Sequence, residues 1–209
     1  MGVGNVGTAL SENLKKRGYE VLHNDPPRAA REENFDNTPL DKLLQESDMV
    51  TLHTPLDDTT RNLASTNFFN TLGKGKFFIN ASRGEVTDEK ALLRAMEEEK
   101  VAAAVIDVWH KEPEINELLL ERALITTPHI AGYSEQGKAN GTAMMVAAVA
   151  SFFGLEGLKE WYPSDVERNS DQKVAPEAYD ILSDSKRLKN NKKEFEELRN
   201  GYKYRKEFF

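Results

Sequence analysis

Three glycines near the start of the chain constrain its fold more than any other feature. Gly2, Gly4 and Gly7 have the spacing G-x-G-x-x-G and run directly into an apolar pattern of helical period, which extends to Lys16 and is stopped by Gly18. In such a loop the backbone can approach a pyrophosphate closely, and the helix that follows offers unpaired N–H donors. Taken alone, the triplet is explained equally well by a tight turn that opens a helix.

The acidic residue Asp25 favours the dinucleotide interpretation. It stands eighteen positions after Gly7 and follows Tyr19–His23, a predicted short strand that Pro26 and Pro27 end. A carboxylate at this place can accept hydrogen bonds from both ribose hydroxyls of NAD and would repel the 2′-phosphate of NADP. An ordinary Asp-Pro turn is the structural alternative. With the glycines before it, Asp25 predicts NAD as the cofactor.

Apolar segments alternate with helical patterns along the rest of the chain. Buried strands are predicted at residues 48–53, 76–80, 101–108 and 124–127, and helices at 40–45, from an N-cap at Asp88 onward, and at 135–153. Strands alternating with helices are typical of an α/β fold with a parallel sheet. We therefore predict a Rossmann-like, doubly wound parallel sheet over residues 1–157, and a linker with a second, partial region over 158–209.

Composition excludes several classes of function. The chain has no cysteine, so disulfides, thiolate metal sites and cysteine nucleophiles are ruled out. A net charge of −7 disfavours nonspecific nucleic-acid binding. The longest apolar run, residues 143–153, is too short to cross a bilayer, and the first residues lack a signal-peptide pattern. We expect a cytoplasmic protein that binds neither nucleic acid nor membrane.

Two charged residues stand near the ends of predicted strands, where α/β sheets bind ligands. Arg83 follows strand 76–80, and its guanidinium could hold a carboxylate or a phosphate in a bidentate fork. A surface ion pair is the commoner role for such an arginine. Asp107 has two similar interpretations, as a ligand in the crevice or as a helix cap.

The histidines offer several candidates for a general base. His23, His53, His110 and His129 share no short metal-ligand spacing, so no metal site is expected. His53 and His129 both stand at predicted strand ends, and either could act as a base. His110 beside Glu112 is another conceivable pair. Periodicity alone does not choose among them.

Taken together and in this order, these segments resemble the D-isomer-specific 2-hydroxyacid dehydrogenases. The matching segments are Gly2–Gly7, Asp25, His53–Pro55, Asn80–Gly84, Ile106–Trp109 with Glu112 and Pro113, and Thr127–Gly132. Further segments are most similar to a member of the family that oxidises a small phosphorylated 2-hydroxy acid: Asp25–Pro27, Pro128–Lys138, Gly141–Thr142, Ala178–Ile181 and Phe195–Arg205. The last two resemble the start of a C-terminal α+β dimerisation region, which implies a homodimer.

The resemblance implies a role for each matching residue. Arg83 would bind the substrate carboxylate, His129 would exchange a proton with the substrate hydroxyl, and Glu112 would orient His129 and stabilise its charged form. Tyr133 would reach the substrate. The implied NAD-binding residues are Gly2, Gly4, Asn5, Val6, Gly7, Asp25, Thr54, Ala81, Asp107 and Gly132.

One departure from the family pattern concerns the N-terminus. Only Met1 precedes Gly2, whereas the fingerprint follows a central strand of about five residues. We therefore expect a fragment of a longer gene that lacks this first strand, part of the substrate domain and the phosphate contacts. If the chain is instead complete, uncovered strand edges predict poor solubility and little turnover.

Three other functions stay open at this point. The chain could belong to a sister dehydrogenase that acts on glycerate, lactate or 3-phosphoglycerate. It could be a non-catalytic NAD-binding remnant, although Arg83, Glu112 and His129 would then have no chemical task. A structural dimerisation protein rests only on the C-terminal tail.

Overall fold

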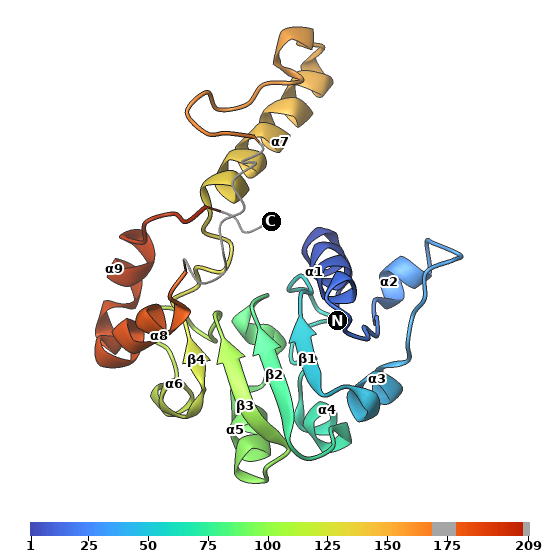
Figure 1. Cartoon of the computed structure of the whole chain (residues 1–209), viewed down its shortest axis with the longest axis vertical. Helices are drawn as coiled ribbons and strands as arrows, with labels where there is room; N and C mark the ends of the chain where they lie inside the picture. The colour runs from blue at the N-terminus through green and yellow to red at the C-terminus, as the bar shows by residue number, and fades with distance from the viewer. Residues whose placement is uncertain (169–178, 207–209) are drawn as a thin grey trace.

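The computed structural model describes residues 1–168 and 179–206, and within these its centre is a parallel sheet of four strands in the order β1-β2-β3-β4 (Figure 1). The strands are β1 Met49–Leu52, β2 Lys76–Asn80, β3 Val101–Ile106 and β4 Ile125–Thr126. Their side chains form much of the core, because Leu52, Phe78 and Ala104 are fully buried. The predicted parallel α/β sheet is confirmed.

Helices connect the strands and extend beyond the sheet. The α-helices are α1 Asn5–Lys16, α2 Pro26–Ala29, α3 Leu40–Glu46, α4 Thr66–Thr71, α5 Glu89–Glu97, α6 Glu117–Arg122, α7 Glu135–Phe153, α8 Ile181–Asn190 and α9 Phe195–Asn200, and the short 3₁₀ turns are η1 Gly84–Val86, η2 Glu156–Leu158 and η4 Lys192–Glu194. The predicted N-cap is confirmed, because the Asp88 carboxylate accepts hydrogen bonds from the amides of Lys90 and Ala91. The helix predicted at 135–153 has these bounds in the structure.

A cluster of three phenylalanines packs α4 against the sheet. Phe68 and Phe69 of α4 lie against Phe78 of β2, and the rings of Phe69 and Phe78 meet edge to face at 5.3 Å. Aromatic pairs in this geometry add to the free energy gained by burying their surface. These contacts pack the middle of β2 against α4.

The register of the sheet brings the ends of the strands together. Leu52 pairs with Asn80, Asn80 pairs with Ile106, and Ile106 pairs with Thr126. The segments that follow these residues therefore leave the sheet at the same edge, which is the upper edge in Figure 1, beside the N-terminus and the start of α7. Motifs far apart in the sequence meet at this edge.

The segment Tyr19–His23 is not a strand, which corrects the prediction. Its neighbour is the short N-terminal segment, in which the Gly2 amide donates to the Asn24 carbonyl at 2.9 Å and the Met1 carbonyl accepts from the His53 amide at 2.8 Å. Met1 and Gly2 thus bridge residue 24 and the end of β1. Two residues are too few to build a ladder along the whole of residues 19–23, so this segment forms no strand.

The described part of the C-terminal region packs against the outer strand β4. Ser185 of α8 accepts a hydrogen bond from the Thr126 amide at 3.0 Å, and Lys189 donates to the Ala123 carbonyl at 2.6 Å. Leu188 and Phe195 are buried in the same core as the sheet. Helix α8 was not predicted from the sequence. The boundary near Gly157 stays a prediction, and part of the predicted linker and dimerisation region, residues 169–178 and 207–209, lies outside the described residues.

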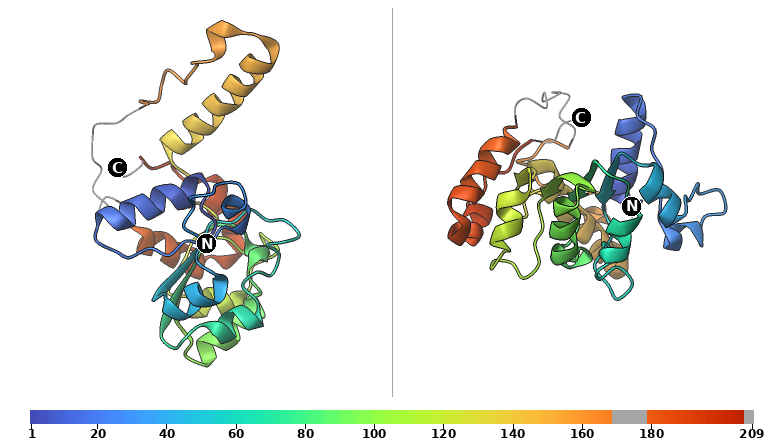
Figure 2. Two further views of the ribbon diagram at one scale, coloured as in Figure 1. Left: turned by 90° about the vertical axis from the view of Figure 1, so that its right-hand side faces the viewer. Right: turned by 90° about the horizontal axis from the view of Figure 1, so that it is seen from below.

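Helix α7 projects away from the sheet, as Figure 2 shows. Its far end and the turn after it expose large apolar side chains: Met144, Met145, Val149, Phe152, Phe153, Leu155 and Leu158. Among the described helices none is both long enough and apolar enough to cross a membrane.

Substitution of Gly84 in the turn η1 tests how closely the elements at the upper edge of the sheet are packed. A Cβ atom on Gly84 would lie 2.0 Å from the backbone carbonyl of Trp109, so η1 would have to move. We expect Gly84→Ala to lower the free energy of unfolding by about 2–3 kcal/mol, measured by urea denaturation. Gly141→Ala is the matched control, because nothing lies within 4 Å of its Cβ and alanine favours the helix by about 0.5–1 kcal/mol. Unchanged stability of Gly84→Ala would contradict this packing.

Candidate active site

A histidine and a glutamate form a hydrogen-bonded pair at the upper edge of the sheet. Nδ1 of His129 lies 2.8 Å from Oε2 of Glu112, and the other oxygen of Glu112 accepts a hydrogen bond from the Trp109 amide at 2.9 Å. Both side chains are mostly buried. Because Nδ1 faces the carboxylate, Nε2 is the ring nitrogen left to meet a substrate. The sequence pattern left open whether Glu112 pairs with the neighbouring His110. In the structure Glu112 pairs with His129 and not with His110.

The carboxylate of Asp107 holds the loop that carries His129. Its Oδ1 accepts hydrogen bonds from the Thr127 hydroxyl at 2.6 Å and from the Ile130 amide at 2.8 Å, and its Oδ2 accepts from the Ala131 amide at 3.0 Å. The Asp107 carbonyl also accepts from the His129 amide at 2.8 Å. His129 itself adopts a positive φ of 57°, a strained conformation for a non-glycine residue. Asp107 therefore compensates for the strain of this loop.

Arg83 lies in the loop after β2 and is exposed to solvent. Its guanidinium donates to the Ser82 carbonyl at 2.6 Å, and no carboxylate of the described chain forms an ion pair with it. Asn80 shapes this loop, because its side-chain amide donates to the Arg83 carbonyl and to Thr87, while its oxygen accepts from Ser82. The surface ion pair considered from the sequence is therefore absent in the described part of the chain.

Two glycines of the glycine loop lie where there is no room for a side chain. A Cβ on Gly7 would lie 2.1 Å from the Gly2 carbonyl oxygen, and a Cβ on Gly2, whose φ is +74°, would lie 2.7 Å from the backbone of His53. Gly4 instead has open space around it. It precedes α1 without a side-chain cap and without an acidic residue in the first turn of the helix. The amides at the start of α1 are thus available to an anion such as a pyrophosphate.

The predicted ribose-binding residue Asp25 also organises the loop. Its carboxylate accepts hydrogen bonds from the Val3 amide at 2.7 Å and from the Arg28 amide at 2.9 Å. The Arg28 guanidinium donates to the Val3 carbonyl and to Thr8. A groove of about 530 Å³ lies between these groups and Gly4. A carboxylate has lone pairs left after two such bonds, so Asp25 can still accept from ribose hydroxyls.

Further residues that the resemblance assigns to NAD lie along the same edge. The Thr54 hydroxyl is buried without a hydrogen-bond partner in the described chain, and its backbone amide lies against Gly2. A buried polar group without a protein partner is rare, and this hydroxyl is available to a bound ligand. Exposed Asn5 and Val6 begin α1, Ala81 follows β2, and Gly132 is open. This set of groups fits a dinucleotide, and each individual role stays a prediction.

The other histidines have structural partners. Burial, reinforced by the charge of the N-terminal amino group, lowers the pKa of His53 to about 4, and Nε2 of His53 lies 3.0 Å from the Thr51 hydroxyl. Nε2 of His23 lies 2.7 Å from the hydroxyl of Ser11, and burial is the main cause that lowers the pKa of His23. Within the residues that the structure describes, no cluster of side chains could hold a metal ion.

Tyr133 lies in an aromatic and basic cluster with the C-terminal segment. Its ring meets that of Tyr204 at 5.7 Å, and the ammonium of Lys138 lies 4.0 Å from the ring centroid. Arg205 donates to the carbonyls of Ile130, Ala131 and Tyr133. The sequence analysis did not identify Arg205, because nothing in a sequence places residue 205 beside residue 131.

The comparison with protein families explains this arrangement. Residues 1–131 match the model of the D-isomer specific 2-hydroxyacid dehydrogenase, NAD binding domain. The chain belongs to this family. The match covers the glycine loop, the Asp107 anchor and the Glu112–His129 pair, and it ends before α7, α8 and α9.

Curated relatives share the sequence over nearly the whole chain. An erythronate-4-phosphate dehydrogenase of Bacteroides thetaiotaomicron is 42% identical over 99% of this chain and 62% of its own length. One of Yersinia enterocolitica is 36% identical over 100% of this chain and 61% of its own length. The narrower resemblance that the sequence predicted is therefore confirmed. The chain spans about three fifths of the length of these relatives.

Solved structures agree on the fold. A D-lactate dehydrogenase from Treponema pallidum matches with a TM-score of 0.63 and 29% identity, over 73% of this chain and 51% of that one. The NAD complex of a D-isomer specific 2-hydroxyacid dehydrogenase from Lactobacillus delbrueckii matches with a TM-score of 0.62 and 29% identity, over the same shares. The predicted Rossmann-like architecture is thus confirmed.

Removal of the Asp107 carboxylate tests its role as the anchor of the loop that carries His129. In Asp107→Ala the amides of Ile130 and Ala131 lose their acceptor, so we expect a loss of about 2–3 kcal/mol in the free energy of unfolding and faster hydrogen exchange at these two amides. The amides of β2 serve as the internal reference. The control is Asp48→Ala, whose exposed carboxylate precedes β1. Unchanged exchange at residues 130 and 131 would contradict the anchor.

Proposed function

We propose that this chain is part of an NAD-dependent dehydrogenase that oxidises 4-phospho-D-erythronate to 2-oxo-3-hydroxy-4-phosphobutanoate, a step of pyridoxal 5′-phosphate biosynthesis. The observation that carries the proposal is the Glu112–His129 pair, which leaves Nε2 as the free ring nitrogen at the edge of a dinucleotide-binding sheet. Family membership supports the reaction type. The names of the curated relatives support the substrate.

The chemistry needs a base for one proton of the substrate. When a 2-hydroxy acid is oxidised, the hydroxyl proton passes to Nε2 of His129 while the hydrogen on C2 leaves as hydride with its electron pair. Bound NAD supplies the hydride acceptor. The products are the 2-oxo acid, the reduced cofactor and one proton, which His129 later releases to solvent. Glu112 stabilises the imidazolium during this step, because its carboxylate lies on Nδ1.

Arg83 orients the substrate. Its exposed guanidinium is free of competing carboxylates in the described chain, so it can bind the carboxylate of the 2-hydroxy acid in a bidentate fork. This contact would place C2 and its hydroxyl between His129 and the cofactor. Tyr133, four residues after His129, would contact the rest of the substrate.

Kinetics on a hybrid enzyme test the reaction and the substrate together. The hybrid carries residues 1–209 in place of the matching region of the Bacteroides thetaiotaomicron relative, and formation of the reduced cofactor is followed at 340 nm. We expect kcat/KM for 4-phospho-D-erythronate to exceed the values for D-lactate, D-glycerate and 3-phospho-D-glycerate. A preference for one of these acids would assign the chain to a sister dehydrogenase.

Substitution of the base separates catalysis from cofactor binding. His129→Asn should lower kcat by about 10²–10⁴-fold and leave the Kd for NAD unchanged. His110→Asn is the matched control, because this exposed side chain lies outside the pair. Turnover that survives in His129→Asn would remove the base role. NAD binding without turnover in the unmodified hybrid would indicate a binding module instead.

We also propose that the protein forms a homodimer through the region 158–209. Support comes from the exposed apolar side chains Leu158 and Trp161, which single copies rarely leave in water as a group. Sedimentation velocity should show a dimer, and the double variant Leu158→Gln, Trp161→Gln should sediment as a monomer. The control is Leu118→Gln on α6, whose exposed side chain lies outside this region. A monomer in the unmodified protein would overturn the dimer.

A further inference from the structure

We propose that Arg199 of α9 is a positioning residue for the Glu112–His129 pair, and that the C-terminal segment 195–206 completes the active-site geometry. This inference rests on the proposed function, because it assigns a task to the pair only if His129 acts as the base. Arg199 lies outside the segment matched by the family model, which ends at residue 131. Nothing in the first 131 residues supplies an equivalent cation next to Glu112.

The contact between Arg199 and Glu112 is direct and involves the oxygen that binds His129. The terminal nitrogen Nη1 of Arg199 lies 3.8 Å from Oε2 of Glu112, and His129 Nδ1 lies 2.8 Å from the same oxygen. At 3.8 Å the guanidinium is too far to form a hydrogen bond with the carboxylate. It therefore acts through its charge and leaves the hydrogen-bond position on Oε2 to His129.

The guanidinium is held in place from several sides. Glu196 of the same helix lies 3.8 Å from Nη1 of Arg199, and Tyr133 is among the neighbouring groups that raise the pKa of Arg199. Burial lowers the pKa of Arg199, but the contacts with Tyr133, Glu112 and Glu196 together raise it by more, so the cation persists. Its Nε is buried without a hydrogen-bond partner in the described chain. Burial of a polar group without a hydrogen-bond partner costs free energy. We therefore expect the guanidinium to have a function, and its contact with Glu112 provides one.

The charge of Arg199 matters because Glu112 is largely removed from water. Its side chain is only 16% exposed, so solvent screens nearby charges from it less than at the surface. The role of Glu112 requires the carboxylate form, because a protonated carboxyl group would donate its hydrogen bond to Nδ1 and the neutral ring would then carry its proton on Nε2. A cation next to Oε2 favours the carboxylate form. The carboxylate accepts the Nδ1 proton and keeps Nε2 free as the base.

Arg205 extends the same support to the backbone of the catalytic loop. Its guanidinium donates to the carbonyls of Ile130 at 3.1 Å and Ala131 at 2.6 Å, immediately after His129. Its own carbonyl accepts from the Glu135 amide at 2.9 Å, so the segment pairs with the start of α7. Asp107 thus holds the loop from the sheet side and Arg205 holds it from the C-terminal side.

The fold explains how α9 reaches the site. Phe195, at the first residue of α9, is 1% exposed and belongs to the core of the sheet domain. Leu188 of α8 is buried in the same core. Phe195 therefore anchors the start of α9 in this core, and Arg199, one turn later, lies beside Glu112 in the loop after β3.

The test determines which ring nitrogen of His129 carries the proton, and it uses the chain of residues 1–209. Long-range ¹H–¹⁵N spectra of the histidine side chains, recorded where the imidazole is neutral, distinguish a proton on Nδ1 from a proton on Nε2. We expect a predominant Nδ1–H tautomer in the unmodified chain and a mixture of both tautomers in Arg199→Gln. Arg199→Lys should restore the predominant tautomer, because it restores the charge. Arg187→Gln is the matched control.

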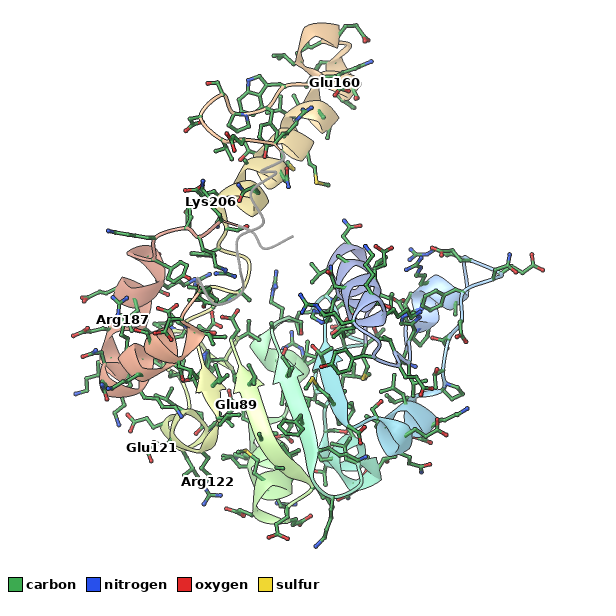
Figure 3. All side chains as sticks on the ribbon, in the orientation of Figure 1. Glu89, Glu121, Arg122, Glu160, Arg187 and Lys206 are labelled. Carbon is green, nitrogen blue, oxygen red and sulfur yellow. The ribbon has the colours of Figure 1, made fainter. Side chains whose placement is uncertain are left out.

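Arg187 suits this purpose because its guanidinium is 63% exposed and pairs only loosely with Asp184 on α8; Figure 3 labels it on the C-terminal helices. His23 provides a second control within every spectrum, since its contact with Ser11 reports whether the fold is intact. A variant that keeps the His23 signal and changes the His129 signal has lost a local interaction and not its fold.

A reference variant separates this inference from the proposed function. Glu112→Ala removes the acceptor itself and should abolish the tautomer preference of His129. If the preference persists in Glu112→Ala, the pair is not the functional dyad and the proposed function fails. If it is lost in Glu112→Ala but kept in Arg199→Gln, the pair stands and the role of Arg199 is overturned. A failure of Arg199→Lys to restore it would equally overturn a role that acts through charge.

Discussion

The hydrogen bonds accepted by the buried Asp107 carboxylate are the interaction on which the rest of the site depends. Asp107 follows β3 directly, so the sheet fixes its position. Its oxygens accept hydrogen bonds from Thr127, Ile130 and Ala131, which lie on both sides of His129 in the chain. His129 lies inside this clamp with a positive φ. Without the clamp the backbone would relax, because strain of this kind persists only where surrounding contacts compensate for it.

Close backbone contacts also fix the position of the glycine loop, which lies beside the end of β1. Gly7 lets α1 approach the backbone of Gly2, and Gly2 lets the loop approach the backbone that follows β1, so closely that a Cβ at either position would collide with main-chain atoms. Gly4 makes no such contact and leaves the start of α1 open. The three glycines of one motif therefore serve two purposes, since two of them set the packing and one leaves room for an anion.

Much of the fold and part of the site could be predicted from the sequence. Strand Lys76–Asn80 and helix Glu135–Phe153 are found at the predicted residues, because an apolar run and a capped helical pattern are local signals. Tyr19–His23 carries the same local signal and is not a strand, because pairing depends on a neighbour. Periodicity did not choose between His110 and His129 as the partner of Glu112, since the pairing follows from the paths of two loops.

The sequence by itself determined the chemistry that is available: the glycine triplet with Asp25, an arginine after β2, and a glutamate and a histidine after later strands. Only the tertiary structure decided which of these groups meet. It placed Glu112 beside His129, the pairing that the family resemblance implied and that periodicity left open, and turned Asp107 into the anchor of the loop that carries His129. It also brought Arg199 and Arg205 to that loop from some 70 residues further along the chain. The physical reason is that a spacing along the chain specifies local backbone geometry, whereas contacts between distant segments depend on sheet register, on the packing of α8 against β4 and on the burial of Phe195 in the core.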